Sequence, residues 1–204
     1  DEGAGAILIS NTVNGDIAFQ FDEMTLAYNV QAAVHDNFEV DWPGGSTNYG
    51  NHVHPEGWTT FDARRTQNSA SDLPRVYGET GKSLVLRDSN LSYFTSPMLS
   101  NGIGEIHFLF RNWETNGVDP GAFHVQKSIS GASNWVTVGM ATNILTVDYC
   151  HFVTNVNDRN FNYVRILNDT NPGNHLLMID EVIITEPGAG AFFSNLTHSP
   201  LSPA

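Results

Sequence analysis

EIHFLFRNW, residues 105–113, decides the fold class. Ile106, Phe108 and Phe110 alternate with mostly polar neighbours, which is the period of a strand that buries one face. Short runs of this kind, separated by turn-forming residues, continue on both sides, whereas helical periodicity is almost absent. We expect strands over residues 4–10, 16–21, 37–42, 58–61, 83–87, 93–99, 122–128, 134–138, 149–156, 163–167 and 176–185, while 24–34 fits a helix or a strand equally well. The pattern predicts an all-β protein.

The composition argues against some classes of binding partner and favours another. The 204 residues are 40% hydrophobic, which is enough for a sizeable core, but only 15% charged. The net charge is −13, from 22 acidic and 9 basic residues, and a field of that sign repels nucleic-acid phosphates and anionic lipid. No run of 18 apolar residues occurs, so we expect no membrane span. The same surplus of carboxylates suits Ca²⁺, whose ligands are oxygens.

Changes in composition along the chain predict three parts. Residues 1–35 form an N-terminal extension with an apolar strand, and residues 36–186 form the β-sandwich. Residues 187–204 begin with Pro-Gly-Ala-Gly, a linker-like sequence, and form an extended tail or the start of another module. The long polar stretches 43–56 and 63–80 are expected to bind something or to close over a face of the sandwich.

Several ordered motifs carry a family resemblance. They are DNFE at 36–39, GW at 57–58, GKSLVL at 81–86, YFTSPML at 93–99, IHFLFR at 106–111, Trp135 after a Ser-Gly turn, and MIDEV at 178–182. In this order they resemble the MAM-like and carbohydrate-binding-module-like jelly rolls of bacterial secreted or cell-surface proteins. The resemblance implies a two-sheet jelly-roll sandwich of Ig-like or galactose-binding-like form, in which Trp58 and Trp135 are core residues.

The resemblance also implies a structural calcium ion where the first and last strands meet. Glu39 and Asp180 match those positions. Both acids also fit a simpler interpretation, as exposed strand ends or turn formers. Calcium is the one cofactor that the sequence suggests.

No catalytic motif is present, and we predict that the chain is not an enzyme. Cys150 is the only cysteine and lies next to His151, but a small buried strand residue is the favoured interpretation over a nucleophile. His52 and His54 could chelate a metal from one strand face, yet no third ligand lies at an informative spacing. A hydrolase on this scaffold is retained only as a third hypothesis, because sequence cannot place two carboxylates across a cleft.

Two hypotheses of function follow, both for an extracellular or cell-surface protein. The leading one is a structural protomer of a bacterial filament or layer, which polymerises with itself by strand addition or docking of its ends. The donor strand is bare and apolar, and its residues are Ala4, Ala6, Ile7, Leu8 and Ile9.

The alternative is a non-catalytic carbohydrate-binding module of a secreted enzyme or adhesin. Aromatic rings bind the C–H faces of sugars and amides bind hydroxyls. Trp42, Tyr49 and Trp113 border loops and are the predicted sugar-binding residues. Asn90, Asn168 and Asn195 lie in sequons and are candidate glycosylation sites.

Overall fold

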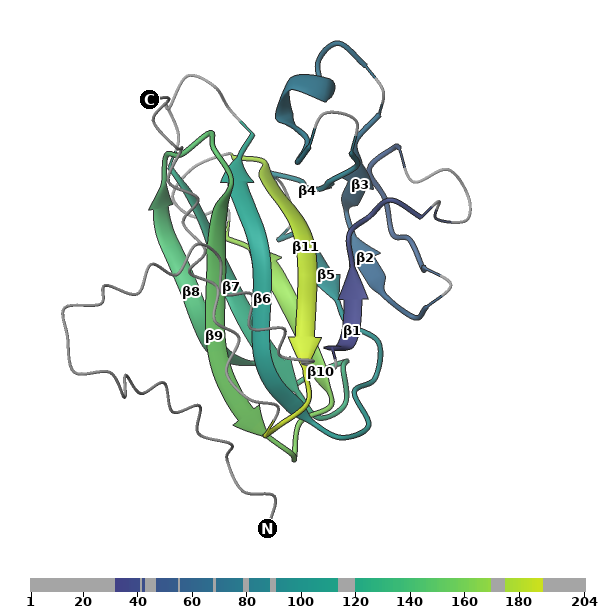
Figure 1. Cartoon of the computed structure of the whole chain (residues 1–204), viewed down its shortest axis with the longest axis vertical. Coiled ribbons are helices and arrows are strands. Elements are labelled where there is room, and N and C mark those ends of the chain that lie inside the picture. Colours follow the sequence, from purple (N-terminus) through teal and green to yellow (C-terminus); the bar gives the residue numbers. More distant parts are fainter. Residues whose placement is uncertain are drawn as a thin grey trace, which may run out of the picture.

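The computed structural model describes residues 32–40, 42, 47–54, 56–67, 69–78, 81–88, 91–113, 120–169 and 175–188, which form two antiparallel sheets packed face to face (Figure 1). The architecture is a two-sheet jelly-roll sandwich, so the predicted fold class is confirmed. Most of the predicted N-terminal extension and C-terminal tail lies outside the described residues.

Sheet A is built around β11. Its spatial order is β3 (Ala63–Arg65), β4 (Leu84–Leu86), β11 (Leu177–Thr185), β6 (Ile103–Asn112) and β9 (Cys150–Asp158), and β1 (Ala32–Asp36) also pairs with β11. Strand β4 pairs with the first part of β11 and β1 with its last part, end to end along the edge opposite β6. The described sandwich therefore begins at Ala32, slightly before the predicted boundary at residue 36.

Sheet B is continuous. Its order is β2 (Thr59–Phe61), β5 (Tyr93–Thr95), β10 (Tyr163–Asn168), β7 (Gly121–Ser128) and β8 (Val136–Ile144). The strand predicted over 134–138 is longer than expected, because β8 is an edge strand with many exposed positions and little apolar alternation. The strand predicted over 93–99 is shorter, since pairing ends at Thr95.

Alternation along the strands sends large apolar side chains between the sheets. The rings of Phe94 and Trp58 stack at 4.6 Å and 4°, and Phe38 meets Phe94 edge-on at 5.2 Å. A second aromatic cluster of Phe108, Phe123 and Phe152 fills the other end of the core. Burying such rings dominates the energetics of a sandwich of this size.

The segment 69–78, with the 3₁₀ helix η1 (Leu73–Arg75), lies near β3 and β4 at one end of the sandwich (Figure 1). The N–H of Tyr77 donates to Oγ of Ser83, and Arg64 on β3 pairs with Asp72. Val85 and Met178 are fully buried although alternation turns them to the outer face of sheet A. The stretch 63–80, which was predicted to bind something or to close over a face, thus contacts β3 and the residue before β4 and also lines an open pocket described below.

One predicted strand is wrong. Of the predicted strand 37–42, residues 37–40 turn instead of extending: Phe38 has a φ of 61°, and its N–H donates to Oδ1 of Asp36 at 2.7 Å. This Asx-type turn brings the chain away from sheet A after β1. In the part of the chain that the structure describes, no helix is long and apolar enough to cross a membrane.

Candidate functional site

The outer face of sheet B carries two rows of side chains that run across all five strands. Inward positions such as Phe94, Ile166 and Val125 are buried, so their neighbours point outward. The register aligns Thr59, Thr95, Arg165, Gln126 and Thr137 in one row, and Phe61, Tyr93, Leu167, His124 and Met140 in the next. Strands that are far apart in sequence thus build one surface.

Four planar groups on this surface form a series that we call the planar row: Phe61, Tyr93, Arg165 and Trp135. The rings of Phe61 and Tyr93 stack at 5.3 Å and 15°. The guanidinium carbon of Arg165 lies 5.3 Å from the ring centre of Tyr93 and 4.4 Å from that of Trp135. All four side chains are partly exposed. Sequence reasoning missed three of them and placed Trp135 in the core, whereas it belongs to this surface.

Polar groups surround the planar row. Nε of Arg165 donates to Oε1 of Gln126 at 2.7 Å, and Nε2 of Gln126 donates to Oγ1 of Thr137 at 3.2 Å. Nearby on the same face, Nε2 of His124 lies 2.9 Å from Oδ2 of Asp169. Burial lowers the pKa of Arg165, only partly offset by Tyr93. The surface combines flat apolar groups with fixed hydrogen-bonding groups, as polar-ligand sites do.

The predicted sugar platform of Trp42, Tyr49 and Trp113 does not form. Trp42 is only 3% exposed and packs in the core beside Phe94 and His54, so its prediction as a surface residue is wrong. Tyr49 and Trp113 do come together, but around Arg64, whose guanidinium carbon lies 5.3 Å from the Tyr49 ring and 5.2 Å from the Trp113 ring.

Each of these two rings has a second arginine over it. The guanidinium carbon of Arg87 lies 5.1 Å from the Tyr49 ring, and that of Arg75 lies 4.6 Å from the Trp113 ring. The five side chains alternate cation and ring. A sugar could stack on either ring only by competing with an arginine.

An open pocket of about 440 Å³ adjoins this cation–ring series. Its lining side chains all carry hydrogen-bonding groups: Thr47, Asn48, Tyr49, Arg64, Gln67, Ser69, Ser71 and Asp72. The single cation in the lining, Arg64, is already paired with the single carboxylate, Asp72. The pocket is polar and electrically balanced.

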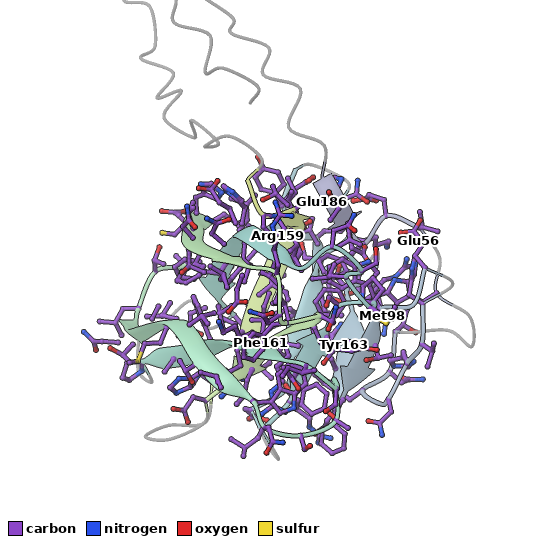
Figure 2. All side chains as sticks on the ribbon, turned by 90° about the horizontal axis from the view of Figure 1, so that it is seen from below. Glu56, Met98, Arg159, Phe161, Tyr163 and Glu186 are labelled. Atoms are coloured by element: carbon purple, nitrogen blue, oxygen red, sulfur yellow. The ribbon has the colours of Figure 1, made fainter. Side chains whose placement is uncertain are left out.

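A smaller pocket, of about 300 Å³, lies at the opposite end of the sandwich. Figure 2 views this end and shows Arg159 next to Glu186. Nδ2 of Asn101 donates to Oε1 of Glu186 at 2.7 Å. Arg159 is exposed and lines this pocket, to which no residue of the planar row contributes, so it is a useful control position.

Glu39 and Asp180 lie close together, as the calcium prediction requires. Oε1 of Glu39 accepts the N–H of Lys82 at 2.6 Å, and Oδ2 of Asp180 accepts the hydroxyl of Ser83, also at 2.6 Å. Burial raises the pKa of Asp180 to about 7, and the charges of Glu181 and Glu39 act in the same direction against the hydrogen bonds that Asp180 accepts.

This pair offers the oxygen donors that calcium prefers, and a cation beside two neighbouring carboxylates would offset the cost of keeping both ionised. Among the described residues, no three His, Cys, Asp or Glu side chains are grouped so that they could hold a metal. Calcium at Glu39 and Asp180 would therefore need backbone or hydroxyl oxygens as well. His52 and His54 likewise belong to no group of three metal-binding side chains among the described residues.

Asn168 cannot carry a glycan in the folded protein. It is fully buried, and its Nδ2 donates to the backbone oxygens of Arg87 and His175, each at 3.0 Å. Its prediction as a glycosylation site is wrong, because Nδ2 is the atom to which a glycan would be attached. Asn90 and Asn195, together with Ala4, Ala6, Ile7, Leu8 and Ile9 of the predicted donor strand, lie outside the described residues.

Cys150 is exposed at the start of the edge strand β9, so its interpretation as a buried strand residue is also wrong. The period-two pattern around it correctly predicted a strand. The pattern could not show that β9 has a sheet neighbour on one side only.

The fold has known relatives, although no family model and no curated protein matches the sequence. The K2 cleaved adhesin domain of Lys-gingipain aligns over 71% of this chain and 97% of its own, with a TM-score of 0.53 and 14% identity. The K1 domain from Porphyromonas gingivalis W83 aligns over 76% and 98%, with the same TM-score and identity.

The fold of this chain resembles that of a carbohydrate-binding module to the same extent as that of the adhesin domains. The CBM22-1 xylan-binding domain of Paenibacillus barcinonensis Xyn10C aligns over 78% of this chain and 96% of its own, with a TM-score of 0.51 and 15% identity. At such identities the likeness concerns the fold alone. Adhesin and carbohydrate-binding domains thus share the jelly-roll sandwich of this chain, whereas no comparison supports the MAM-like part of the resemblance.

Proposed function

We propose that this protein is a non-catalytic glycan-binding module of a secreted or cell-surface protein, and that it binds its ligand on the outer face of sheet B. The observation that carries the proposal is the planar row. It places three aromatic rings and one guanidinium side by side across the sheet, with amide, hydroxyl and imidazole groups next to them.

A glycan-binding site needs both flat apolar groups and fixed hydrogen-bonding groups. The C–H face of a pyranose is apolar and packs on an aromatic ring, while its hydroxyls need donors and acceptors held at fixed positions. The hydrogen bond from Arg165 to Gln126 fixes two such polar groups before a ligand arrives. Because the outward side chains form rows across five strands, the face suits an extended chain rather than a single sugar.

The structural neighbours support the same class. The fold is shared with a domain described as xylan-binding and with adhesin domains. This favours the glycan-binding hypothesis over the filament protomer. Assembly through Ala4, Ala6, Ile7, Leu8 and Ile9 stays a prediction, since those residues lie outside the described part of the chain.

We further propose that Glu39 and Asp180 help to hold a structural Ca²⁺, with backbone or hydroxyl oxygens completing the set. Both carboxylates are anchored to the consecutive residues Lys82 and Ser83, between β3 and β4. The ion would tie the turn after β1 to β11, and its contribution would be to stability.

The glycan-binding proposal is tested with a glycan array followed by calorimetric titration of any polysaccharide found. We expect Tyr93→Ala and Trp135→Ala each to weaken binding by roughly five- to hundredfold, as expected for the loss of about 1–3 kcal/mol of stacking. Trp113→Ala is the matched control, since it removes an aromatic ring at another site, and should leave affinity unchanged.

Two results would overturn the proposal. One is the absence of binding to any glycan by the correctly folded protein. The other is binding that survives the double variant Tyr93→Ala/Trp135→Ala but is lost in Trp113→Ala, which would move the site to the pocket beside Arg64.

A further inference from the structure

Acidic residues are unevenly distributed between the two sheets. The five strands of sheet B contain no Asp or Glu, although the chain has 22 acidic residues against 9 basic ones. Sheet B does contain Lys127 and Arg165, and Lys127 is paired with Asp158 of β9 at 2.6 Å. The nearby carboxylate of Asp169, just after β10, is paired with His124. Arg165 therefore carries the one unneutralised charge on the described strands of this sheet.

Arg165 is fixed but unsatisfied. Tyr93 and Trp135 hold its guanidinium plane, and Gln126 accepts from Nε. Among the described residues, Nη1 and Nη2 make no hydrogen bond and no ion pair. The Nη atoms of Arg165 are not among the buried atoms that lack a partner, so water reaches them and a ligand carboxylate could replace that water. Two parallel N–H donors in a fixed plane are the complement of a carboxylate.

A second group beside Arg165 also lacks a partner. Thr95 is the direct register partner of Arg165 on β5 and is 6% exposed. Its Oγ1 is buried and has no hydrogen-bond partner in the described structure. A buried hydroxyl left unpaired costs free energy, but because solvent does not reach Oγ1, a ligand oxygen could pair with it only after neighbouring side chains shift. Arg165 and Thr95 are direct register neighbours on adjoining strands of the face.

We infer that the ligand of this face is an acidic polysaccharide, and that the carboxylate of a uronic acid residue binds the two Nη groups of Arg165 beside Thr95. This rests on the proposed glycan-binding function and names its ligand class. The net charge of −13 does not oppose it at contact distance: at physiological ionic strength, exposed charges more than about 8 Å away are largely screened. The face itself offers no strand carboxylate to repel the ligand.

The test compares polymers that differ only in the carboxylate. Polygalacturonate and alginate are each titrated against their own methyl esters, in about 0.15 M salt. We expect at least one of the two acids to bind roughly ten- to hundredfold more tightly than its ester, as a charge-assisted bidentate pair would give. Arg165→Gln removes one member of the planar row and so weakens both ligands, but it should weaken the acid at least tenfold more than the ester and so abolish the preference for the acid. Arg159→Gln is the control for loss of a positive charge elsewhere and should change neither.

The outcomes separate the inference from the proposed function. If acid and ester bind equally, or if Arg165→Gln weakens both alike, the uronate inference is wrong. The glycan-binding proposal then still stands wherever Tyr93→Ala and Trp135→Ala weaken binding to any glycan. If neither acid binds while a neutral glycan does, the inference is likewise overturned.

Discussion

Arg64 and Asp72 form a two-pronged ion pair, in which Nη1 and Nη2 reach the two carboxylate oxygens at 2.8 and 3.1 Å. The pair joins β3 to the segment 69–78, which packs beside sheet A. Burial by itself would raise the pKa of Asp72, but the hydrogen bonds from Arg64 and from the N–H of Gln67 outweigh it and hold the pKa below the usual value. The segment 69–78 is thus held to β3 by an ion pair that is largely shielded from water.

Removing the arginine of this pair should destabilise the protein strongly. Arg64→Ala leaves Asp72 buried without its counter-charge, and we expect the free energy of unfolding to fall by about 3–5 kcal/mol. Urea unfolding measures this, and the double variant Arg64→Met/Asp72→Leu should recover part of the loss because no charge is left unpaired. A loss below about 1 kcal/mol in the single variant would contradict the expectation, since that is typical of an exposed pair.

Acid should weaken the fold through two histidines on the outer face of sheet A. His107 and His151 stack at 5.6 Å, and burial lowers the pKa of both below the ordinary 6.5. The hydrogen bond from His107 to Glu105 acts against this shift, whereas the neighbouring His107 adds to the shift of His151.

Because both native pKa values lie below those of the unfolded chain, the unfolded state binds more protons as the pH falls through the region of 6.5. The stability that the two neutral histidines contribute is therefore full above that pH and declines below it. Asp180 acts in the opposite direction over the same range, because its pKa is raised to about 7 and its protonation in the folded state stabilises the protein as the pH falls. Thermal unfolding of Asp180→Asn followed from about pH 8 to pH 5 should therefore show the decline, and adding His107→Gln should flatten it. An unchanged slope in that variant would assign the decline to other groups.

Calcium should stabilise the protein if Glu39 and Asp180 hold it. At a hundredfold excess over its dissociation constant, the ion adds about 2.7 kcal/mol, which raises Tm by roughly 5–11 °C for a chain of this size. The measurement is thermal unfolding with calcium, with magnesium and with a chelator. Asp180→Asn should abolish the response to calcium, and a wild-type Tm that is the same with calcium and with chelator would remove the proposal.

Asn168 should behave as a core residue. Asn168→Ala removes two hydrogen bonds to buried backbone oxygens, and we expect the free energy of unfolding to fall by about 2–4 kcal/mol. When the chain is expressed in a glycosylating host, mass spectrometry of the folded protein should find the peptide around Asn168 without a glycan. A fully glycosylated, folded product would contradict the burial of this side chain.

The strand pattern was readable from the sequence because alternation is local. EIHFLFRNW became β6 with its phenylalanines facing inward, and the segments of β7, β10 and β11 were placed nearly to the residue. The pattern failed at residues 37–42, where the side chain of Asp36 caps a turn that apolar periodicity does not reveal. It also failed to show which strands lie at sheet edges, a property of the pairing and not of the strand itself.

The residues of the candidate site could not be predicted from the sequence, for a different reason. Phe61, Tyr93 and Arg165 come from three separate strands and meet only through the register β2–β5–β10. Sequence reasoning favoured aromatic residues that border loops, and so chose Trp42, which is a core residue. One signal was available: in Tyr93-Phe94-Thr95 a buried Phe94 forces its two neighbours to the opposite face. That Tyr93 and Thr95 lie beside Arg165 could be known only from the strand pairing in the structure.

The strand carboxylates lie on one sheet only, and this gives the sandwich two unlike sides. Five carboxylates belong to strands of sheet A: Asp36, Glu105, Asp158, Asp180 and Glu181. The described strands of sheet B contain no carboxylate. A carboxylate-bearing polymer that lies along sheet B therefore meets no strand carboxylate of like charge, and at physiological ionic strength the charges of the other sheet are largely screened from it.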